Sequence, residues 1–207
     1  MESPPPRRTQ ADRRARTETR LLEAALRLIA LAGSRGTSVA DVASDAGYSR
    51  GIITHQFGGK EGLLRAAAQH AVAVVAEPDP ALPAFDWLQS FVSNYLSGSD
   101  PSTAATRAFL VMWCEAAAGE PVLRGLFRER DARFRSAIAD ALKRGVEDGS
   151  IRRDVNPEAY AYLLVGQLRG IGVQLILSED STARSSILSE CVEMVRRHLR
   201  PDRAAGD

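Results

Sequence analysis

The chain has 207 residues, of which 44% are hydrophobic and 26% are charged, ordinary values for a globular protein with a sizeable core. It contains no run of about 18 uninterrupted apolar residues, so we expect no membrane-spanning helix. The first eight residues, MESPPPRR, lack the apolar segment of a secretory signal. We therefore expect a cytoplasmic protein.

The net charge of +1 hides an asymmetry along the chain. Residues 1–76 hold 11 Lys and Arg against 7 Asp and Glu, a net +4, whereas residues 77–207 hold 16 against 19, a net −3. A basic N-terminal part on a slightly acidic remainder is typical of a nucleic-acid-binding module joined to a module of another kind. Chance scatter of surface charge is the alternative.

The residues that usually carry catalysis or hold metals are scattered. Cys114 and Cys191 lie in apolar helical contexts without a Cys-x-x-Cys pair, so we expect buried free thiols. His55, His70 and His198 belong to no Ser/His/Asp or metal-ligand pattern, and no Gly-rich phosphate loop occurs. The sequence predicts no catalytic residue, no metal site and no cofactor.

A Pro-rich basic arm, residues 1–11, opens the chain and holds too little apolar surface to fold alone. Arginines cluster in and just after it: Arg7, Arg8, Arg13, Arg14 and Arg16. Such arms reach DNA phosphates or a minor groove, although a solvated tail explains Arg7 and Arg8 equally well. The first helix is expected over residues 12–32, with Leu21, Ala25, Leu28, Ile29 and Ala32 on its buried face.

Residues 37–60 read TSVADVASDAGYSRGIITHQFGGK and predict two short helices joined by a tight turn. Ser38 and Asp41 form a capping-box pattern, and Gly47 suits the left-handed position that ends the first helix. Ser49 is expected to cap the second helix, which carries polar residues among Ile52, Ile53 and Phe57. This arrangement is typical of a helix-turn-helix, whose second helix enters the DNA major groove.

The segment from about Thr19 to Ala71 resembles the DNA-binding domain of the TetR family of bacterial transcriptional regulators. The resemblance covers Leu21 to Ala25, Gly36 to Ala43, Ala46 to Gly51, His55 to Phe57 and Lys60 to Leu64. It implies a helix-turn-helix domain over residues 12–76, including a fourth helix from Gly59-Lys60 to about Ala76 that connects to the rest of the chain.

The candidate DNA-binding residues are Thr37, Ser38, Tyr48, Ser49, Arg50, Gly51, Thr54, His55, Gln56 and Lys60. Arg50 either donates bidentately to guanine or clamps a phosphate. Gly51 would allow close approach of the helix. The resemblance implies phosphate contacts for Thr54, His55 and Lys60; the family usually has Tyr in place of Thr54 and an aromatic residue in place of Gln56.

Four of these candidates have alternative explanations. Gln56 is either a base reader or simply exposed. Thr37 and Ser38 lie where a helix N-terminus can meet phosphate, although capping alone explains them. Tyr48 is either a phosphate contact or a packing residue. Lys60 lies at the start of the fourth helix, whose free N–H groups offer an anion site.

The remaining chain is predicted to be all helical. We expect helices ending near Gly98, over residues 102–118, from Pro121 to about residue 148, over residues 157–177 and over residues 183–199. No stretch alternates as a strand, so the sequence predicts an all-α protein of about nine helices. Residues 83–200 would form a ligand-sensing and dimerisation domain, followed by a disordered tail over residues 201–207.

Bulky residues of these helices could line a ligand cavity between the fifth and eighth helices, although core packing is the simpler explanation for any one of them. The candidates are Trp87, Phe91, Tyr95, Phe109, Met112, Trp113, Phe127, Phe134, Tyr160, Leu163 and Gln167. Gln167, Arg169 and Gln174 are polar groups in this apolar setting and therefore candidate specificity determinants. Residues 168–175, LRGIGVQL, resemble the C-terminal domains of betaine-type TetR regulators.

The resemblance also implies a homodimer in which the last two long helices of each subunit form a four-helix bundle. The candidate interface residues are Val165, Leu168, Gly172, Ile176, Leu188, Cys191, Val195 and Leu199. Gly166, Gly170 and Gly172 would each weaken a helix by roughly 1 kcal/mol relative to Ala, which close approach of a partner helix would offset.

The sequence thus predicts a dimeric transcriptional regulator, not an enzyme. Its expected partners are a pseudo-palindromic double-stranded DNA operator and a small-molecule effector, with no membrane. Release of DNA by the effector would make it a repressor, while activation is an open alternative. A nucleoid-type packaging protein would need a larger and more widespread positive charge, and a helical enzyme would need a catalytic constellation.

Overall fold

The computed structural model describes residues 9–72, 78–98, 100, 102–178 and 183–201, which form nine α-helices and no strand. The helices are α1 (Gln10–Gly36), α2 (Val39–Asp45), α3 (Arg50–Phe57), α4 (Lys60–Val72), α5 (Ala84–Gly98), α6 (Ala104–Ala117), α7 (Pro121–Glu147), α8 (Pro157–Leu177) and α9 (Ala183–Leu199). The all-α prediction is confirmed.

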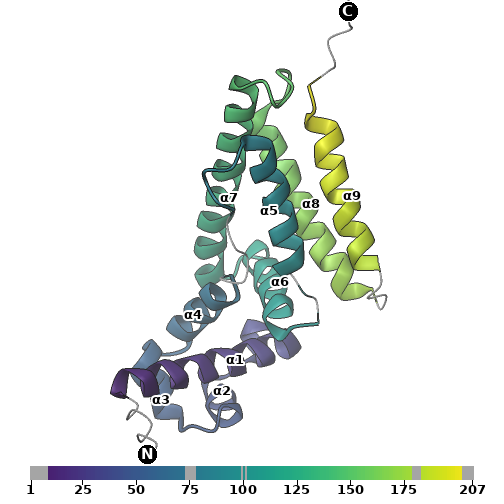
Figure 1. The fold of residues 1–207 in the computed structure, drawn as a ribbon. Helices are drawn as coiled ribbons and strands as arrows, with labels where there is room; N and C mark the ends of the chain where they lie inside the picture. Colours follow the sequence, from purple (N-terminus) through teal and green to yellow (C-terminus); the bar gives the residue numbers. More distant parts are fainter. Residues whose placement is uncertain (1–8, 73–77, 99, 101, 179–182, 202–207) are drawn as a thin grey trace, which may run out of the picture.

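The N-terminal helices and the C-terminal helices occupy opposite ends of the molecule (Figure 1). α1, α2 and α3 form a small bundle at one end, and α4 leads from it toward the longer helices. α7, α5, α8 and α9 run roughly along the long axis, with α9 beside α8, while α6 lies between these helices and α1. The part expected to bind DNA and the part expected to sense a ligand are therefore joined through α4 and α6.

Polar caps at the helix starts explain most of the boundaries. The side chain of Asn156 accepts from the Ala159 N–H at 2.9 Å and precedes Pro157, as expected for the start of α8. α1 begins earlier than predicted because Thr9 and Asp12 form a reciprocal capping box. It also continues beyond residue 32, across a non-helical Gly33 with φ 73°.

The buried side chains form two cores. One joins α1–α4 with α6 and the first turns of α7, where Leu123 and Phe127 are buried. The other joins α5, α7, α8 and α9 around residues such as Leu88, Leu142 and Leu168. Because α6 contributes Phe109, Leu110 and Met112 to the first core, a helix C-terminal to residue 83 packs directly on the DNA-binding bundle.

Some sequence expectations need correction or lie beyond the described residues. Cys191 is buried as expected, but Cys114 is exposed because it lies on the outer side of α6. α4 is described only to Val72, so its predicted extension to residue 76 lies outside the described residues. The same holds for most of the basic arm and of the C-terminal tail.

Among the described residues, one helix, α8, is long and apolar enough to cross a membrane by length and composition alone. In the structure Leu164, Leu168 and Arg169 of this helix are buried in the protein. α8 therefore contributes to the core, where a buried arginine fits better than it would in lipid.

Candidate nucleic-acid interface and ligand-binding domain

The predicted helix-turn-helix is formed by α2, a turn and α3. Val42 and Ala43 of α2 and Ile53 of α3 are buried together in the first core. Gly47 in the turn has φ 76°, the left-handed conformation expected from the sequence. The Tyr48 N–H donates to the Ala43 carbonyl at 2.8 Å and closes the turn. The apolar pattern thus holds the two helices at a fixed angle and leaves one face of α3 outward.

Four candidate residues lie on that outward face of α3. Arg50, Gly51, Thr54 and His55 are all exposed. A Cβ atom built on Gly51 would meet nothing within 4 Å, so the protein itself does not require glycine there. Ser49 occupies the N-cap position, but its side chain makes no capping hydrogen bond. An exposed arginine, a hydroxyl and an unobstructed backbone at a helix start suit contacts with phosphates and base edges.

Other candidates are engaged within the protein. Thr37 is buried, and its hydroxyl donates to the Gly33 carbonyl at 2.8 Å, so it is not available to phosphate. Ser38 accepts from the Asp41 N–H at 3.1 Å, while the Asp41 carboxylate accepts from the Ser38 hydroxyl instead of its N–H. This pair forms only half of the predicted capping box.

Two candidates toward the end of the motif differ in exposure. Gln56 is half-buried, and its amide oxygen is buried without a hydrogen-bond partner, so this oxygen does not face solvent as a base reader would. Lys60 is exposed, and its ammonium donates to the Arg35 carbonyl at 3.3 Å, near the end of α1. Without DNA, Lys60 therefore tethers α4 to α1.

A basic pocket of about 480 Å³ lies between α1 and the turn before α3. Its walls are formed by Arg13, Arg16, Thr17, Arg20 and Tyr48. The Tyr48 hydroxyl donates to Thr17 Oγ1 at 3.3 Å. This hydrogen bond, with smaller contributions from Arg20 and Arg16, lowers the pKa of Tyr48. The pocket concentrates positive charge next to the helix-turn-helix and suits a DNA phosphate.

The sequence analysis singled out Arg13 and Arg16 near the start of the first helix and missed Thr17 and Arg20. Positions 13, 16, 17 and 20 lie on one face of α1. Their spacing of i, i+3, i+4 and i+7 within the expected helix was the available signal.

Most of the predicted ligand-lining aromatic residues are core residues. Trp87 stacks on Phe91 at 5.4 Å between ring centroids, and Phe109 packs on Phe127 at the same distance. Met112 is fully buried, in the first core. These contacts agree with the simpler alternative, in which packing explains their chemistry.

Three other residues do not line the expected cavity. Leu163 points outward and is 69% exposed. Tyr160 stacks on His198 of α9 at 5.3 Å, away from the aromatic cluster of α5–α7. Gln167 donates to the Met194 sulfur at 3.4 Å and belongs to a groove between α8 and α9. The sequence shows which helical residues are bulky, but the direction of each side chain depends on how the helices pack.

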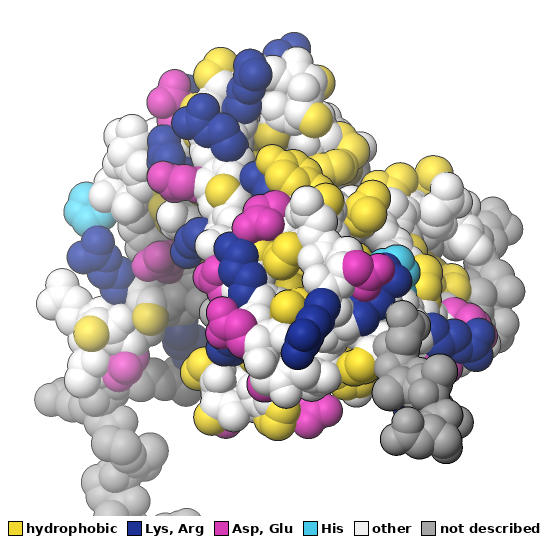
Figure 2. All heavy atoms as spheres, turned by 90° about the horizontal axis from the view of Figure 1, so that it is seen from above, with side chains coloured by type: hydrophobic (Ala, Val, Ile, Leu, Met, Phe, Trp, Pro, Cys, Tyr) yellow, Lys and Arg dark blue, Asp and Glu magenta, His cyan; other side chains and the backbone are white. Residues whose placement is uncertain are grey.

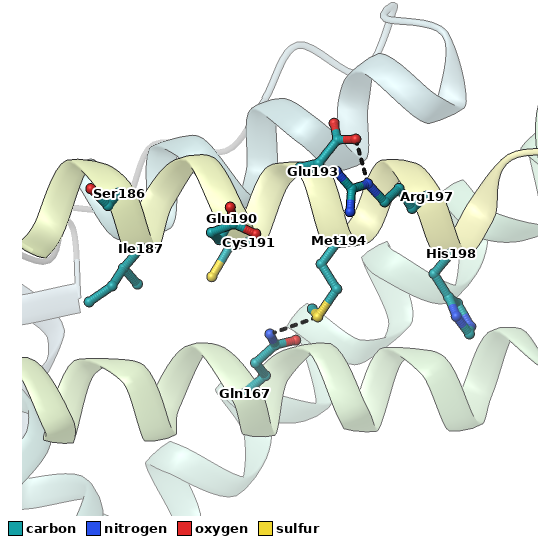
Figure 3. Close-up of a pocket in the computed structure, with 9 residues that line it drawn as sticks. All are labelled: Gln167, Ser186, Ile187, Glu190, Cys191, Glu193, Met194, Arg197 and His198. Atoms are coloured by element: carbon teal, nitrogen blue, oxygen red, sulfur yellow. Dashed lines mark hydrogen bonds and ion pairs between the residues drawn. The ribbon is translucent and has the colours of Figure 1, made fainter.

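That groove between α8 and α9 has a volume of about 670 Å³. Figure 3 shows Ile187, Cys191 and Met194 pointing from α9 toward α8, with Gln167 reaching toward Met194. Glu193 points away from α8 and accepts hydrogen bonds from Arg196 and Arg197 on the same helix. The groove therefore has an apolar floor and a charged outer margin.

An unexpected buried charge cluster lies where α5, α6, α7 and α8 meet. Arg169 of α8 is only 1% exposed; its guanidinium donates to Asp131 Oδ1 at 2.8 Å and to the Tyr95 hydroxyl. Asp131 also accepts from the Trp113 indole N–H at 2.9 Å. The Arg169 guanidinium lies 4.6 Å from the centroid of Phe109. Predicted candidates Tyr95, Phe109 and Trp113 thus surround a cation.

A second arginine in this cluster, Arg130 of α7, is 3% exposed and lies between two rings. Its guanidinium carbon is 4.7 Å from the centroids of both Phe109 and Phe134. Its Nε and Nη1 atoms are buried and have no hydrogen-bond partner. Burial and the nearby Arg169 lower the pKa of Arg130 to about 10. At neutral pH it remains charged, and leaving a buried charge unpaired costs several kcal/mol in general.

Arg130 and Asp131 were absent from the predicted site. Phe127, Arg130 and Phe134 are spaced i, i+3 and i+7, so the sequence did contain a charged residue within the apolar face of the seventh helix. Such a break in the apolar pattern was the missed signal.

The predicted dimer residues are mostly covered within one protomer. Val165, Leu168, Gly172, Cys191, Val195 and Leu199 are all buried, while Ile176 and Leu188 are half-buried. Val165, Leu168, Cys191, Val195 and Leu199 belong to the second core, and Gly172 lies against Leu110 of α6, so these six buried residues are not free to meet a partner. These residues are apolar, as predicted, but they pack within one protomer.

A different stripe of α8 faces outward. Tyr162, Leu163 and Leu177 are 64%, 69% and 74% exposed, and Gly166 and Gly170 between them are exposed as well. A Cβ atom on either glycine would meet nothing within 4 Å. Seen from the end far from α1–α3, hydrophobic side chains gather toward the middle of the face and are flanked by Lys and Arg (Figure 2).

A polar link joins the aromatic region to the DNA-binding bundle. The Glu115 carboxylate of α6 accepts from the Ser34 N–H at 3.0 and 3.2 Å. Ser34 follows Gly33, where a Cβ atom would lie 2.7 Å from Glu115 Oε1. Trp113, two residues before Glu115, is held by Asp131 of α7. α6 thus connects the charge cluster to the end of α1.

Among the described residues, no three or more His, Cys, Asp or Glu side chains gather in a way that could hold a metal ion.

Comparison with known proteins places both ends of the chain in one family. The family model for bacterial regulatory proteins of the tetR family matches residues 21–67, and the model for the C-terminal domain of BetI-type transcriptional repressors matches residues 84–200. The first match contains α2 and α3, and the second runs from the start of α5 to just beyond α9.

Several curated relatives are named HTH-type transcriptional regulator BetI. The protein from Burkholderia lata is 31% identical over 57% of this chain, an alignment that spans 63% of that relative's length. The one from Proteus mirabilis is 30% identical over 77% of this chain and 80% of its own length. The regulator CymR of Pseudomonas putida is 26% identical over 93% and 95% of the two chains.

Solved structures agree with these matches. A regulator described as a putative TetR-family protein from Rhodococcus superposes with a TM-score of 0.72 at 25% identity, covering 89% of this chain and 99% of its own. A TetR regulator from Chloroflexus aurantiacus gives a TM-score of 0.78 at 22% identity, covering 91% and 98%. The N-terminal family model covers the helix-turn-helix, and the C-terminal model covers the remaining long helices. The chain therefore belongs to the TetR family of bacterial regulatory proteins.

Proposed function

We propose that this protein is a cytoplasmic, homodimeric transcriptional repressor that leaves its operator when a small molecule binds to the helical domain. The observation that carries the proposal is the outward face of α3, where Arg50, Gly51, Thr54 and His55 are exposed beside the basic pocket of α1. Such a face can enter a major groove while the pocket holds the backbone.

The exposed stripe of α8 supports the dimer. Tyr162, Leu163 and Leu177 present apolar surface, and Gly166 and Gly170 allow another helix to approach closely. Exposed glycines inside a helix each cost roughly 1 kcal/mol relative to Ala, a cost that packing of a partner helix would offset. A two-fold axis through this stripe would pair two recognition helices and require an inverted repeat in the DNA.

The connections between the domains support control by an effector. α4 continues from the DNA-binding bundle, and Glu115 of α6 holds the Ser34 N–H of α1. A ligand that moves α6 would therefore alter the orientation of α1 and change the spacing of the two recognition helices. The coupling typical of such a switch is about 1–3 kcal/mol.

One solved regulator of similar fold, from Saccharomonospora viridis, is described as a complex with choline; it is 22% identical to this chain and has a TM-score of 0.71. At that identity the likeness establishes the fold, so it does not identify the effector of this protein.

Selection of sheared genomic DNA on the purified protein at moderate salt tests this function. The proposal predicts recovery of a few fragments that share an inverted repeat. Recovery of unselected fragments would favour a DNA-packaging role, and recovery of none from ligand-free protein would contradict operator binding. Arg50→Ala should relax base preference at one position of each half-site, by about 1–3 kcal/mol of discrimination.

A further inference from the structure

Arg130 is a buried cation, and two of its guanidinium nitrogen atoms have no hydrogen-bond partner in the protein. Its Nε and Nη1 are buried and without a hydrogen-bond partner, although the side chain is only 3% exposed. Buried polar groups in folded proteins are nearly always hydrogen-bonded, so an unpaired guanidinium needs an explanation. Its two ring contacts, with Phe109 and Phe134, offset part of the lost hydration but use none of its N–H groups.

The nearby carboxylate is already engaged elsewhere. Asp131 accepts from Arg169 through Oδ1 and from the Trp113 indole through Oδ2. Arg130, Arg169 and Asp131 together carry a net charge of +1, because the lowered pKa of Arg130, about 10, still leaves it protonated at neutral pH. The cluster is therefore short of one negative charge.

We propose that Arg130 is the anchor of a binding site for a small monocarboxylate with an apolar or aromatic body. A carboxylate accepts hydrogen bonds from a guanidinium and supplies the missing single negative charge. A phosphate monoester would bring close to two charges and leave the apolar site with an excess of negative charge. The faces of Phe109 and Phe134 lie against the anchor, so the edges of these rings are what remains to contact the apolar body.

The same geometry argues against a quaternary ammonium ligand. Such ligands are held by the faces of aromatic rings. Here Phe109 and Phe134 face the Arg130 guanidinium, and Phe109 and Trp113 lie 4.6 and 5.9 Å from that of Arg169. The protein's own cations already occupy these faces, and a cationic ligand would meet two like charges.

The site lies near the surface at Asp131 and is connected through α6 to the DNA-binding bundle. Asp131 and Trp113 are partly exposed and form the edge nearest solvent. A carboxylate at Arg130 would compete with Asp131 for the neighbouring guanidinium and so loosen its hold on Trp113. Trp113 lies on α6 two residues before Glu115, which binds the Ser34 N–H. This consequence for DNA rests on the proposed function, whereas carboxylate binding itself does not.

Calorimetric titration of the full-length protein tests the site without DNA. The probes are benzoate, phenylacetate and octanoate, with benzamide as a neutral analogue and choline as a cation. We expect at least one carboxylate to bind roughly tenfold or more tightly than benzamide and choline, and Arg130→Met to weaken it by a similar factor. Arg128→Met, an exposed arginine of the same helix, should bind like wild type.

Thermal unfolding of the ligand-free variants tests whether Arg130 has a purely structural role. Arg130→Met removes an unpaired buried charge, so its melting temperature should equal or exceed that of wild type. Arg130→Lys keeps the charge and should retain part of the carboxylate affinity. The absence of any preference for carboxylates would overturn the site, and a lower melting temperature for Arg130→Met would then assign Arg130 a structural role. Tightest binding of choline or undiminished carboxylate binding by Arg130→Met would also overturn the site.

Measuring whether a bound carboxylate releases the operator distinguishes failure of this site from failure of the proposed regulatory function. Carboxylate binding that depends on Arg130 but releases no operator would support the site and contradict the effector-released repressor. Specific operator binding by a protein that shows no carboxylate preference would support the regulator and overturn the site.

Discussion

Gly51 lies in the first turn of α3, exposed and with open space where a Cβ atom would stand. Gly51→Ala should therefore leave the free energy of unfolding unchanged or slightly raised, because Ala favours helix more than Gly. Operator affinity should fall, because the added methyl group would meet the DNA when the helix enters the groove. Urea unfolding and a fluorescence-anisotropy titration measure the two effects.

Gly125→Ala is the matched control for this substitution. Gly125 lies on α7, is exposed and also has nothing within 4 Å of its Cβ position. It should leave operator affinity unchanged. If Gly51→Ala bound operator as well as wild type, close approach of α3 at this residue would be excluded.

If the basic pocket binds a DNA phosphate, its arginines contribute to the salt dependence of DNA affinity. Arg20→Ala should weaken binding to all DNA sequences alike and lower the slope of log affinity against log salt by about one, because one phosphate contact is lost. Arg27→Ala is a fair control: Arg27 is also on α1, but pairs with Asp45 at 2.6 Å. Equal slopes for wild type and Arg20→Ala would exclude the pocket as a phosphate contact.

For individual residues, the sequence predicted exposure on α3 better than it predicted which side chains make contacts within the protein. Arg50, Gly51, Thr54 and His55 were predicted outward and are exposed. Thr37 turned inward to the Gly33 carbonyl, since helix α1 ends with a local bend that the sequence does not specify. Arg130 was missed because its environment is created by residues of another helix as well as its own.

Among the elements, α6 carries the connection between the two ends of the molecule. Glu115→Ala should lower the free energy of unfolding by about 1–3 kcal/mol, because the buried Ser34 N–H loses its acceptor. It should also reduce the effect of the effector on operator affinity. Denaturant unfolding and operator titration with and without effector test both parts.

The exposed Glu129 of α7 provides the control for Glu115. Glu129→Ala should change neither stability nor effector response. A Glu115→Ala protein that unfolds at a lower urea concentration but responds fully to effector would show that this bond stabilises the fold without transmitting the signal.

Helix boundaries were the most predictable feature because local chemistry sets them. Asn156-Pro157 begins α8 and Gly98 ends α5, as the sequence indicated. Which face of each helix is buried was harder to predict, above all for α8, which is apolar over most of its circumference. The choice between Leu168, which is buried, and Leu163, which is exposed, depends on the tertiary packing of four helices.

In the whole molecule, the glycines of α8 give the clearest test of assembly. Gly166→Leu should fold normally, because the protomer leaves open space at this position, but should prevent close approach of a partner helix. Light scattering after gel filtration should then give the mass of one chain for the variant and of two chains for wild type. Gly125→Leu, on α7, should remain dimeric; a dimeric Gly166→Leu would place the interface elsewhere.

Regulation by this protein requires two copies of α3 to read one operator. The most direct measurement is titration of the purified protein against the selected operator and against the same DNA with one half-site scrambled. We predict that two chains bind the intact inverted repeat and that scrambling one half-site weakens binding by at least about 100-fold, a smaller factor than the roughly 10³-fold or more that separates specific from non-specific sites, because one half-site remains. Equal affinity for the two DNAs would contradict a dimeric, sequence-specific regulator.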